Sequence, residues 1–507
     1  MNTANRVILN TSILYLKIIL STVISLISVP LVLHALGKSD YGVYTLVAGV
    51  IGMLAFLNAS LSISTQRFFS VAVGAADKIK LNEIFNVAIV LHLLIGFVLV
   101  ILFEACYPFL FSGFLKIDVE RLFAAKTIYH FLVVSTFFST LTVPYVAFLN
   151  AKENMLVFSL VEIVDALLKL FVALYLASCK MDRLIFYGAS VALITIISVI
   201  FYALFVRYKY KELDLHPFRI FNKDIFKQML GFAGWNTYGA VAMIGRNQGN
   251  AILINMFFGT IANASYGIAN HINGVLSQFS TTIQRALNPQ LMQSEGAGKR
   301  ERLMNISILL SKTTVLLFAF FAVPLLIEMP YVLKLWLKEI PENTIILSRL
   351  ILILTVVFQY STGLKSAIQA VGDIKMYFII IGSLLLMNLP IIYVLYSAGL
   401  PIYYCLIVFV TIETISLFIR MYIVKKKVGI KMMTFAKEVI FKTLLCIFVA
   451  AIPSVIMKLL MKECFGRLLL VVLSYTVIYA LLIWRTSLDD NQKNSIRLFI
   501  TKFIHRK

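Results

Sequence analysis

The stretch Thr11–Val32, TSILYLKIILSTVISLISVPLV, decides the class of this protein. It contains a single charged residue, Lys17, in a block otherwise made of apolar and small hydroxyl side chains. A helix of about 20 such residues spans the hydrocarbon core of a bilayer. The block is too long for the apolar region of a signal peptide and lacks a small-residue cleavage site. We therefore expect it to be the first membrane-spanning helix.

Comparable apolar blocks recur along the whole chain. Of its 507 residues, 60% are hydrophobic and 14% are charged, whereas soluble proteins contain about 25% charged residues. Breaks that contain charged residues, proline or glycine separate fourteen blocks. The sequence therefore predicts an all-α integral membrane protein with about fourteen transmembrane helices, near residues 11–34, 41–65, 83–104, 126–149, 155–178, 184–206, 228–256, 262–284, 304–327, 345–370, 375–397, 401–424, 436–457 and 467–485.

The net charge of +22 reflects basic loops. In a soluble protein such an excess would suggest nucleic acid as a partner, but here the lysines and arginines lie mostly in short loops, where they set topology and meet anionic lipid headgroups. The side that carries the N-terminus and the even-numbered loops holds more than twice as many basic residues as the other side. The positive-inside rule then predicts a multi-pass protein of the bacterial inner membrane with both termini in the cytoplasm.

Motifs for catalysis or metal binding are missing from the sequence. The five cysteines are far apart and form no CxxC pair, so neither a metal site nor a disulfide framework is expected. There is no P-loop, HExxH or GxSxG motif, and the loops are too short for a catalytic domain. We expect no enzymatic activity, no catalytic residues, no metal and no cofactor.

A repeat divides the chain. Gln66-Arg67, followed by Gly74 and Lys78, is echoed by Gln284-Arg285, followed by Gly296 and Lys299, and Gly37 is loosely echoed by Gly259. Parallel repeats of this kind place the substrate at the interface between the halves. We predict two six-helix lobes plus two C-terminal helices, arranged as an N-terminal lobe 1–207, a cytoplasmic basic linker 208–227, a C-terminal lobe 228–424, and two extra helices with a basic tail 425–507.

These features resemble a known transporter superfamily. The fourteen spans in two lobes, Leu36–Tyr44 (LGKSDYGVY) after the first span and Gln66-Arg67 after the second are similar to the multidrug/oligosaccharidyl-lipid/polysaccharide exporters. Within that superfamily the chain looks most like the polysaccharide transporters, which include the O-antigen flippases. The resemblance implies a V-shaped pair of bundles that open alternately to each side of the membrane. It also implies that the substrate is an oligosaccharide on undecaprenyl pyrophosphate, destined for lipopolysaccharide O-antigen, capsule or exopolysaccharide, and that polysaccharide-assembly enzymes are partners.

Candidate substrate-binding groups lie in the seventh and eighth predicted spans. Arg246 is well inside span seven, and a guanidinium offers a planar fork of donors that matches phosphate oxygens. Its alternative role is structural, with the side chain reaching the interface or satisfied by neighbouring carbonyls. Amides in these spans suit sugar hydroxyls or, equally, bonds between helices. Those at helical spacing are Asn236 and Asn250 in span seven and Asn270 and Asn273 in span eight, and Asn247 flanks Arg246.

Five further cations lie in or near the spans, and three of them, Lys17, Arg67 and Arg285, each have two possible roles. Lys17 either lines the cleft or extends to the headgroups. Arg67 and Arg285 either capture a diphosphate or enforce topology, the second being the safer interpretation. Lys365 is expected to pair with Glu413 across the C-terminal lobe. Arg420 lies close enough to a span end to reach the interface.

Span five holds Glu162, Asp165 and Lys169. Because Asp165 and Lys169 are four residues apart, they are expected to neutralise one another, which leaves Glu162 as a candidate proton or sodium site. The alternative is that all three form a structural cluster with another helix.

Two other functions compete with the flippase. A cation-coupled multidrug antiporter of the same superfamily would need carboxylates in the cleft. The first two predicted spans contain no Asp or Glu, which counts against this function. A membrane polysaccharide polymerase or glycosyltransferase would carry a large catalytic loop, which the sequence lacks.

Overall fold

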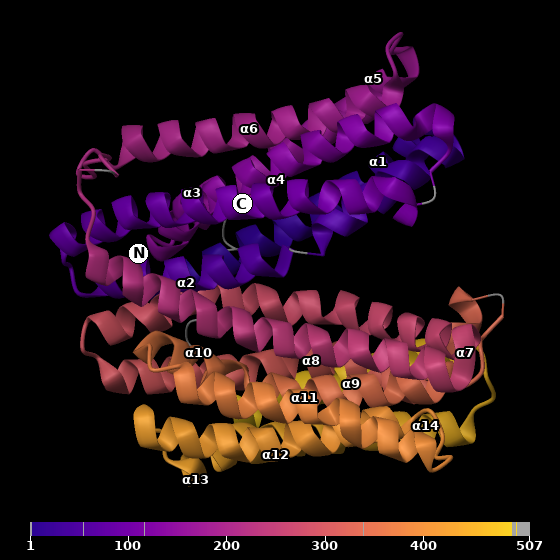
Figure 1. Ribbon diagram of the computed structural model, residues 1–507. Coiled ribbons are helices and arrows are strands. Elements are labelled where there is room, and N and C mark those ends of the chain that lie inside the picture. The colour runs from indigo at the N-terminus through magenta and orange to yellow at the C-terminus, as the bar shows by residue number, and fades with distance from the viewer. Residues whose placement is uncertain are drawn as a thin grey trace, which may run out of the picture. The chain divides into compact units, whose positions relative to one another are not determined.

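A computed structural model describes residues 3–53, 55–115, 117–217, 219–337, 339–488 and Lys493, and all regular structure in these ranges is helical (Figure 1). The α-helices are α1 (Thr3–Gly52), α2 (Ala55–Gly74), α3 (Lys78–Phe109), α4 (Leu122–Ala151), α5 (Met155–Tyr175), α6 (Arg183–Lys209), α7 (Lys223–Gly296), α8 (Arg300–Trp336), α9 (Thr344–Tyr360), α10 (Thr362–Val371), α11 (Lys375–Ser397), α12 (Tyr404–Lys427), α13 (Met432–Phe435), α14 (Lys442–Leu460) and α15 (Phe465–Leu482). Short 3₁₀ and π segments are η1 (Leu110–Phe114), η2 (Val119–Arg121), η3 (Leu176–Ser178), η4 (Ala436–Phe441) and η5 (Ile483–Ser487).

The predicted all-α membrane fold is confirmed. Within the described ranges, 11 helices are long and apolar enough to cross a membrane. Two of these, α1 and α7, break at a glycine and therefore supply two limbs each. The charged residues of α5 keep it outside that group. The limb of α1 after Gly37 has only 15 residues, and the predicted span 41–65 falls on this limb and on α2. With α2 and α5 included, the described helices cover the fourteen predicted spans.

The two broken helices carry the repeat. Gly37 breaks α1 at φ 80°, ψ 168°, and Gly259 breaks α7 at φ 81°, ψ −172°. This region of backbone space is essentially confined to glycine. In the first half α1 ends at Gly52 and α2 carries the chain on to Gly74, 37 residues after the break, and in the second half α7 itself ends at Gly296, also 37 residues after its break. The matching conformation and spacing support a duplicated hairpin at the start of each half.

The same register revises one predicted equivalence. Counted from the two breaks, the position that corresponds to Arg67 is Pro289, whereas Arg285 lies four residues earlier. Four residues are about one helical turn. The Gln66-Arg67 and Gln284-Arg285 pairs are therefore not at equivalent places.

Two compact units make up the chain: one is Leu9–Thr237, and the other contains Tyr238–Lys507. In the first unit, α4 packs against α6 so closely that a Cβ at Gly188 would lie 2.9 Å from Ile128. In the second, α8, α9, α11 and α12 lie side by side (Figure 1). Each unit has its own apolar core. The predicted boundaries at 207, 227 and 424 stay a prediction.

The segment between α6 and α7 is held on α3. The backbone N–H of Asp214 donates to the Asn82 Oδ1 atom at 2.9 Å, and Asn86 Nδ2 donates to the Asp214 carbonyl at 2.8 Å. Glu212 lies 3.1 Å from Lys78 and 3.6 Å from Lys152, and the hydrogen bond from Lys78 is the main cause of its lowered pKa. This basic segment is thus fastened to the N-terminal lobe by specific contacts.

The C-terminal hairpin α14–α15 is bonded along α8. The hydroxyls of Tyr479 and Tyr475 donate to the α8 carbonyls of Leu316 and Ala319, at 3.0 Å and 3.3 Å. Farther along, Arg467 Nη2 donates to the Glu328 Oε2 atom at 2.7 Å, where α8 leaves helical geometry. Glu328 is fully buried, so this ion pair ties the hairpin to the lobe at a site sheltered from solvent.

Candidate functional site

A cavity of about 240 Å³ lies within the C-terminal lobe. Its wall is formed by the two limbs of α7 with α9, α10 and α12, and it is rich in amide and hydroxyl groups. The polar and charged wall residues are Arg246, Asn247, Tyr266, Asn270, Asn273, Ser277, Thr281, Gln284, Thr355, Gln359, Thr362 and Glu413.

Four of the predicted binding residues meet in this wall. Arg246 and Asn247 come from the first limb of α7, and Asn270 and Asn273 come from the second. Asn250, also on the first limb, is fully buried beside Tyr266 and is not part of the wall. Three of the five predicted amides, Asn247, Asn270 and Asn273, therefore share this cavity with Arg246.

Asn236 lies elsewhere. It is buried, and its Nδ2 atom donates to the Phe232 carbonyl one turn earlier at 3.1 Å. Residue 236 also precedes the unit that contains the cavity. Its role in substrate binding stays a prediction without support from this geometry.

Two of the wall amides also make structural bonds. Asn270 Nδ2 donates to the Tyr266 carbonyl at 2.9 Å. Asn273 Oδ1 accepts a hydrogen bond from the Thr355 hydroxyl of α9 at 2.7 Å. Asn273 thus joins two helices, as the structural interpretation expected, whereas Asn270 bonds a carbonyl of its own helix. Sugar binding by these amides stays a prediction.

Arg246 is held inside the lobe and does not extend to the interface. The residue is 5% exposed, and its guanidinium lies 4.5 Å from the centroid of the Phe409 ring. Its Nε atom donates to Asn247 Oδ1 at 3.1 Å, and Nη1 is 3.9 Å from Glu413 Oε2. Stacking on an aromatic face leaves the edge of a guanidinium free to recognise a planar or tetrahedral anion.

Glu413 pairs with a residue that the sequence assigned to the interface. We expected Glu413 to pair with Lys365, but its Oε1 atom accepts a hydrogen bond from Arg420 Nη1, which also donates to the Ser361 hydroxyl at 2.7 Å. Arg420 is 3% exposed, so the expectation that it reaches the headgroups is wrong. A signal existed: residues 413 and 420 are two helical turns apart and share a face of α12.

A smaller cavity of about 80 Å³ adjoins the first. Its wall includes Lys365 and Arg420, and it shares with the larger cavity Met243, Gln284, Phe358 and Thr362. The two cavities therefore form one polar region that is bordered by three basic side chains and one carboxylate.

The other predicted arginines differ from one another. Arg67 is half-buried, with its guanidinium 4.8 Å from the Phe68 ring and 5.2 Å from the Phe232 ring. Arg285 is exposed. Neither lines the two cavities, and their different surroundings agree with the one-turn offset between them.

The charges of the N-terminal lobe pair differently from the prediction. Glu162 forms an ion pair with Lys17 of α1, whose ammonium also lies 5.2 Å from the Phe158 ring centroid. Asp165 accepts a hydrogen bond from the Ser198 hydroxyl at 2.6 Å. Lys169 also acts electrostatically on Asp165, as expected. The expectation that Glu162 is left free is wrong, because the first span supplies its partner. Lys17 is 12% exposed and points to this carboxylate instead of the headgroups.

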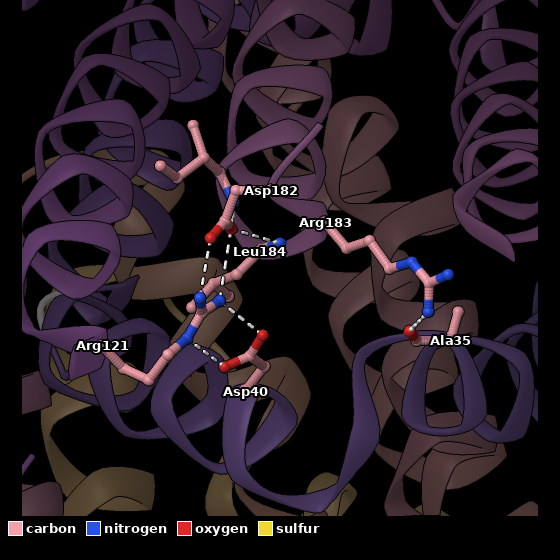
Figure 2. A network of polar contacts seen from close by, with 7 residues as sticks. Ala35, Asp40, Arg121, Asp182, Arg183 and Leu184 are labelled. Carbon is pink, nitrogen blue, oxygen red and sulfur yellow. Dashed lines mark hydrogen bonds and ion pairs between the residues drawn. The ribbon is translucent and has the colours of Figure 1, made fainter. Parts of the chain in front are cut away.

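A polar network that the sequence analysis missed braces the bend of α1 (Figure 2). Arg121 donates to both oxygens of Asp40, at 2.6 Å and 2.5 Å, and to both oxygens of Asp182, at 2.7 Å and 3.2 Å. Arg183 donates to the Ala35 carbonyl at 3.0 Å, two residues before the break at Gly37. The signal was that the loops near residues 38, 121 and 182 were all predicted on one side of the membrane.

The network sets the ionisation of Asp182. Partial burial alone would raise the pKa of this carboxyl, but the hydrogen bond from Arg121 and the backbone N–H groups of Ile185 and Leu184 outweigh it and lower the pKa. Asp182 is also the N-cap of α6, where a carboxylate satisfies free N–H groups. It therefore remains charged at neutral pH and joins three helices.

Comparison with known proteins identifies the fold. Residues 14–175, less than half of the chain, match the MatE family model. Solved structures with similar folds include an outward-facing multidrug resistance MATE family transporter of the MOP superfamily, with 15% identity, a TM-score of 0.70, and coverage of 85% of this chain and 96% of that one. A MATE protein in the bent conformation gives 13% identity, a TM-score of 0.71 and coverage of 85% and 96%.

A third similar structure is a MOP superfamily transporter from Pyrococcus furiosus, with 15% identity, a TM-score of 0.70 and coverage of 86% and 97%. No curated protein matches the chain in sequence. At these identities the likeness establishes the fold, which is that of MATE transporters and of a multi-pass membrane protein. The expectations of no enzymatic activity and no cofactor stay predictions for this chain.

Proposed function

We propose that this protein is a membrane exporter that works by alternating access. The observation that carries the proposal is the MATE transporter fold combined with a polar, charged cavity inside the C-terminal lobe. Charged side chains in a membrane span are costly, at about 2.5–3.5 kcal/mol each on insertion scales, and therefore mark substrate or ion pathways. In this proposal the protein lies in a bacterial inner membrane. Both termini then face the cytoplasm, because basic loops stay on that side of the membrane.

For the substrate, the comparisons favour the cation-coupled multidrug antiporter over the lipid-linked oligosaccharide flippase. One of the three similar structures is a multidrug resistance transporter, and none of the three is described as an oligosaccharide flippase. In this function, Glu162 and Asp165, with Lys169 nearby, are the candidate groups for proton or sodium coupling. Coupling would require the Lys17–Glu162 ion pair to open during the cycle.

One observation favours the flippase as a second candidate. The cavity wall presents Arg246 together with amides and hydroxyls, and the carboxylate in it, Glu413, is already paired with Arg420. A cationic drug would meet a carboxylate that already has an arginine partner, whereas a pyrophosphate and sugars match these donors. The Pyrococcus furiosus protein is described as having a binding pocket of reverse polarity that suggests a different function. The same fold therefore accommodates pockets of either polarity.

Transport in proteoliposomes distinguishes the two candidates. The purified protein is reconstituted and tested for efflux of a cationic dye driven by a sodium or proton gradient, and separately for translocation of an undecaprenyl-pyrophosphate-linked oligosaccharide. Gradient-dependent dye movement supports the antiporter. Movement of the lipid-linked sugar supports the flippase, in which polysaccharide-assembly enzymes supply the substrate and consume the product.

Protein-free liposomes and the Arg246→Gln variant are the controls. Activity in neither assay, with protein that is correctly inserted and monodisperse, would overturn the exporter proposal.

A further inference from the structure

A second large cavity of the C-terminal unit lies between α8 and the segment α13–η4–α14 that begins the C-terminal hairpin. Its volume is about 680 Å³. The first turns of α8 form one side, and α13, η4 and the first residue of α14 form the other. Both segments belong to the same compact unit, and none of the wall residues lines the two polar cavities described above. This cavity is therefore separate from the candidate substrate site.

The wall of this cavity carries an excess of positive charge. Three of its side chains are basic, namely Arg302, Lys312 and Lys442, and two are acidic, namely Glu301 and Glu438. Lys442 Nζ donates to Glu438 Oε2 at 2.6 Å, so these two charges cancel. The other three leave one positive charge in excess. An anion with a single negative charge would balance it.

Arg302 is the basic group that is accessible to a ligand. Its side chain is exposed and, like that of Asn305 one turn later, has no hydrogen-bond or ion-pair partner among the described residues. Across the cavity, the hydroxyl of Thr434 also lacks a partner in the described part of the chain. Lys312, in contrast, is buried and donates to the Ser487 carbonyl at 2.6 Å. Unused donors thus border the cavity on both sides, and Lys312 adds its charge from the buried side.

The cavity lies where two predicted spans begin. These spans start near residues 304 and 436, so Arg302 and Thr434 are just outside the hydrocarbon, whereas Leu309 is within it. Along α8 the wall changes from charged at Glu301 and Arg302 to apolar at Ile308 and Leu309. A phospholipid changes from headgroup to acyl chain in the same order. The cavity therefore matches an amphiphile better than a soluble ion.

The rim of the cavity is suited to contact with lipid. Met433 and Phe441 are next to the wall residues Thr434 and Lys442 in the chain, and they are 67% and 65% exposed. Large apolar side chains exposed together mark a surface that contacts another apolar phase. In a membrane-spanning protein that phase is the bilayer, so lipid can reach the cavity from the side.

We propose that this cavity binds the headgroup of an anionic phospholipid with one phosphate, such as phosphatidylglycerol. Basic pockets between membrane-spanning helices are attractive to such headgroups. Arg302 offers two donors to the phosphate oxygens, and Asn305 and Thr434 offer neutral donors. The headgroup hydroxyls of phosphatidylglycerol can donate to Glu301, which gives the free carboxylate in the wall a partner.

The bound lipid joins α8 to the start of the C-terminal hairpin. Elsewhere along α8 the hairpin is held by Tyr475, Tyr479 and Arg467, and at this end the lipid supplies a bridge between the two segments. Such a lipid is a structural ligand and is not transported, so the site does not depend on the export function.

The test is binding of defined lipids to the delipidated full-length protein in detergent, measured by native mass spectrometry and by the change in Tm. The probes are phosphatidylglycerol, phosphatidylethanolamine and phosphatidylcholine with identical acyl chains. Phosphatidylglycerol should bind at least about fivefold more tightly than the other two and should raise the Tm more. Arg302→Gln should weaken its binding about fivefold, the effect of one basic residue near anionic lipid.

Two further variants separate a built site from general attraction to a basic surface. Lys223→Gln, the matched control, removes an exposed cation from the first turn of α7, outside the cavity, and should bind phosphatidylglycerol like the wild type. Asn305→Trp keeps every charge but fills the cavity from an exposed position, and it should weaken binding at least as much as Arg302→Gln.

Three results would overturn the proposal. The first is equal affinity of the wild type for phosphatidylglycerol and phosphatidylcholine, or tighter binding of phosphatidylethanolamine. The second is an equal loss of affinity in Lys223→Gln and Arg302→Gln, which would indicate attraction to the whole basic surface. The third is unchanged binding by Asn305→Trp, which would place the lipid outside the cavity.

Discussion

Replacing Arg121 with glutamine tests the polar network that braces the bend of α1. In the wild type this guanidinium makes four hydrogen bonds to Asp40 and Asp182. The three side chains are only partly exposed, at 27% for Arg121, 17% for Asp40 and 31% for Asp182. Glutamine can reproduce few of these hydrogen bonds, and it leaves the two carboxylates facing each other without a cation between them.

The size of the effect follows from these contacts. Hydrogen bonds to charged groups contribute about 1.5–3 kcal/mol each, but those within one network are not additive. Partial exposure reduces the sum, because solvent screens exposed ion pairs. We expect Arg121→Gln to lower the free energy of unfolding by about 3 kcal/mol, since only the least exposed of these bonds keep their full value.

The assay is thermal unfolding in detergent at pH 7 for the wild type, Arg121→Gln, Asp40→Asn and the double variant. The double variant should be more stable than Arg121→Gln alone, because it removes one of the two repelling carboxylates. The control, Arg183→Gln, removes only bonds to backbone carbonyls and should cost about 1 kcal/mol. Equal stability of Arg121→Gln and the wild type would refute the idea that the network braces the bend.

The same variant has a defined pH dependence. The pKa of Asp182 is lowered in the folded protein, so its contribution is present above the unfolded pKa of about 3.9 and is lost as the pH falls through the folded pKa. The stability difference between the wild type and Arg121→Gln should therefore be constant from pH 8 to pH 5 and should shrink only in stronger acid. A difference that disappears already near pH 6 would contradict this assignment.

Three further predictions concern packing and the fastening of segments. A Cβ at Gly363 would lie 1.9 Å from a backbone oxygen of α8, so Gly363→Ala should lower the free energy of unfolding by about 3 kcal/mol. Gly267 has open space around it, so Gly267→Ala should leave that free energy unchanged or raise it by up to about 1 kcal/mol. Thermal unfolding of the two variants checks the difference. Arg467→Met should cost about 3–5 kcal/mol because it strands the buried Glu328, and adding Glu328→Gln should restore part of the loss in a double-mutant cycle. Asn86→Ala should change the global Tm by no more than a few degrees but should speed proteolysis of the segment between α6 and α7. The reason is that this segment loses a hydrogen bond worth about 1 kcal/mol. An unchanged rate of cleavage would contradict the idea that Asn86 holds the segment on α3.

Much of the fold was predictable because membrane-spanning helices must be continuous and apolar. The same rule identified Arg246 as exceptional, and helical spacing placed it with Asn270 and Asn273 around one cavity. What the sequence could not provide is the pairing of charges between helices. Glu162 pairs with Lys17, and Glu413 with Arg420, through contacts that depend on which helix faces which.

The contacts of loop residues were still harder to predict. Arg121 is one of several charges in a loop, and only the folded chain shows that it joins Asp40 to Asp182. The glycine breaks are an intermediate case: Gly37 and Gly259 were noticed as an echo, yet the backbone angles were needed to show that both are helix breaks of one kind. With that register, Arg67 and Arg285 are no longer a matched pair.

The central claim is that the C-terminal lobe of an exporter handles its substrate through Arg246. It is tested most directly by initial rates of transport in proteoliposomes for the wild type, Arg246→Gln and Arg285→Gln at equal reconstitution levels, for whichever substrate the wild type moves. The account predicts at least a tenfold loss of rate for Arg246→Gln and a rate within twofold of the wild type for Arg285→Gln. A normal rate for Arg246→Gln would contradict it.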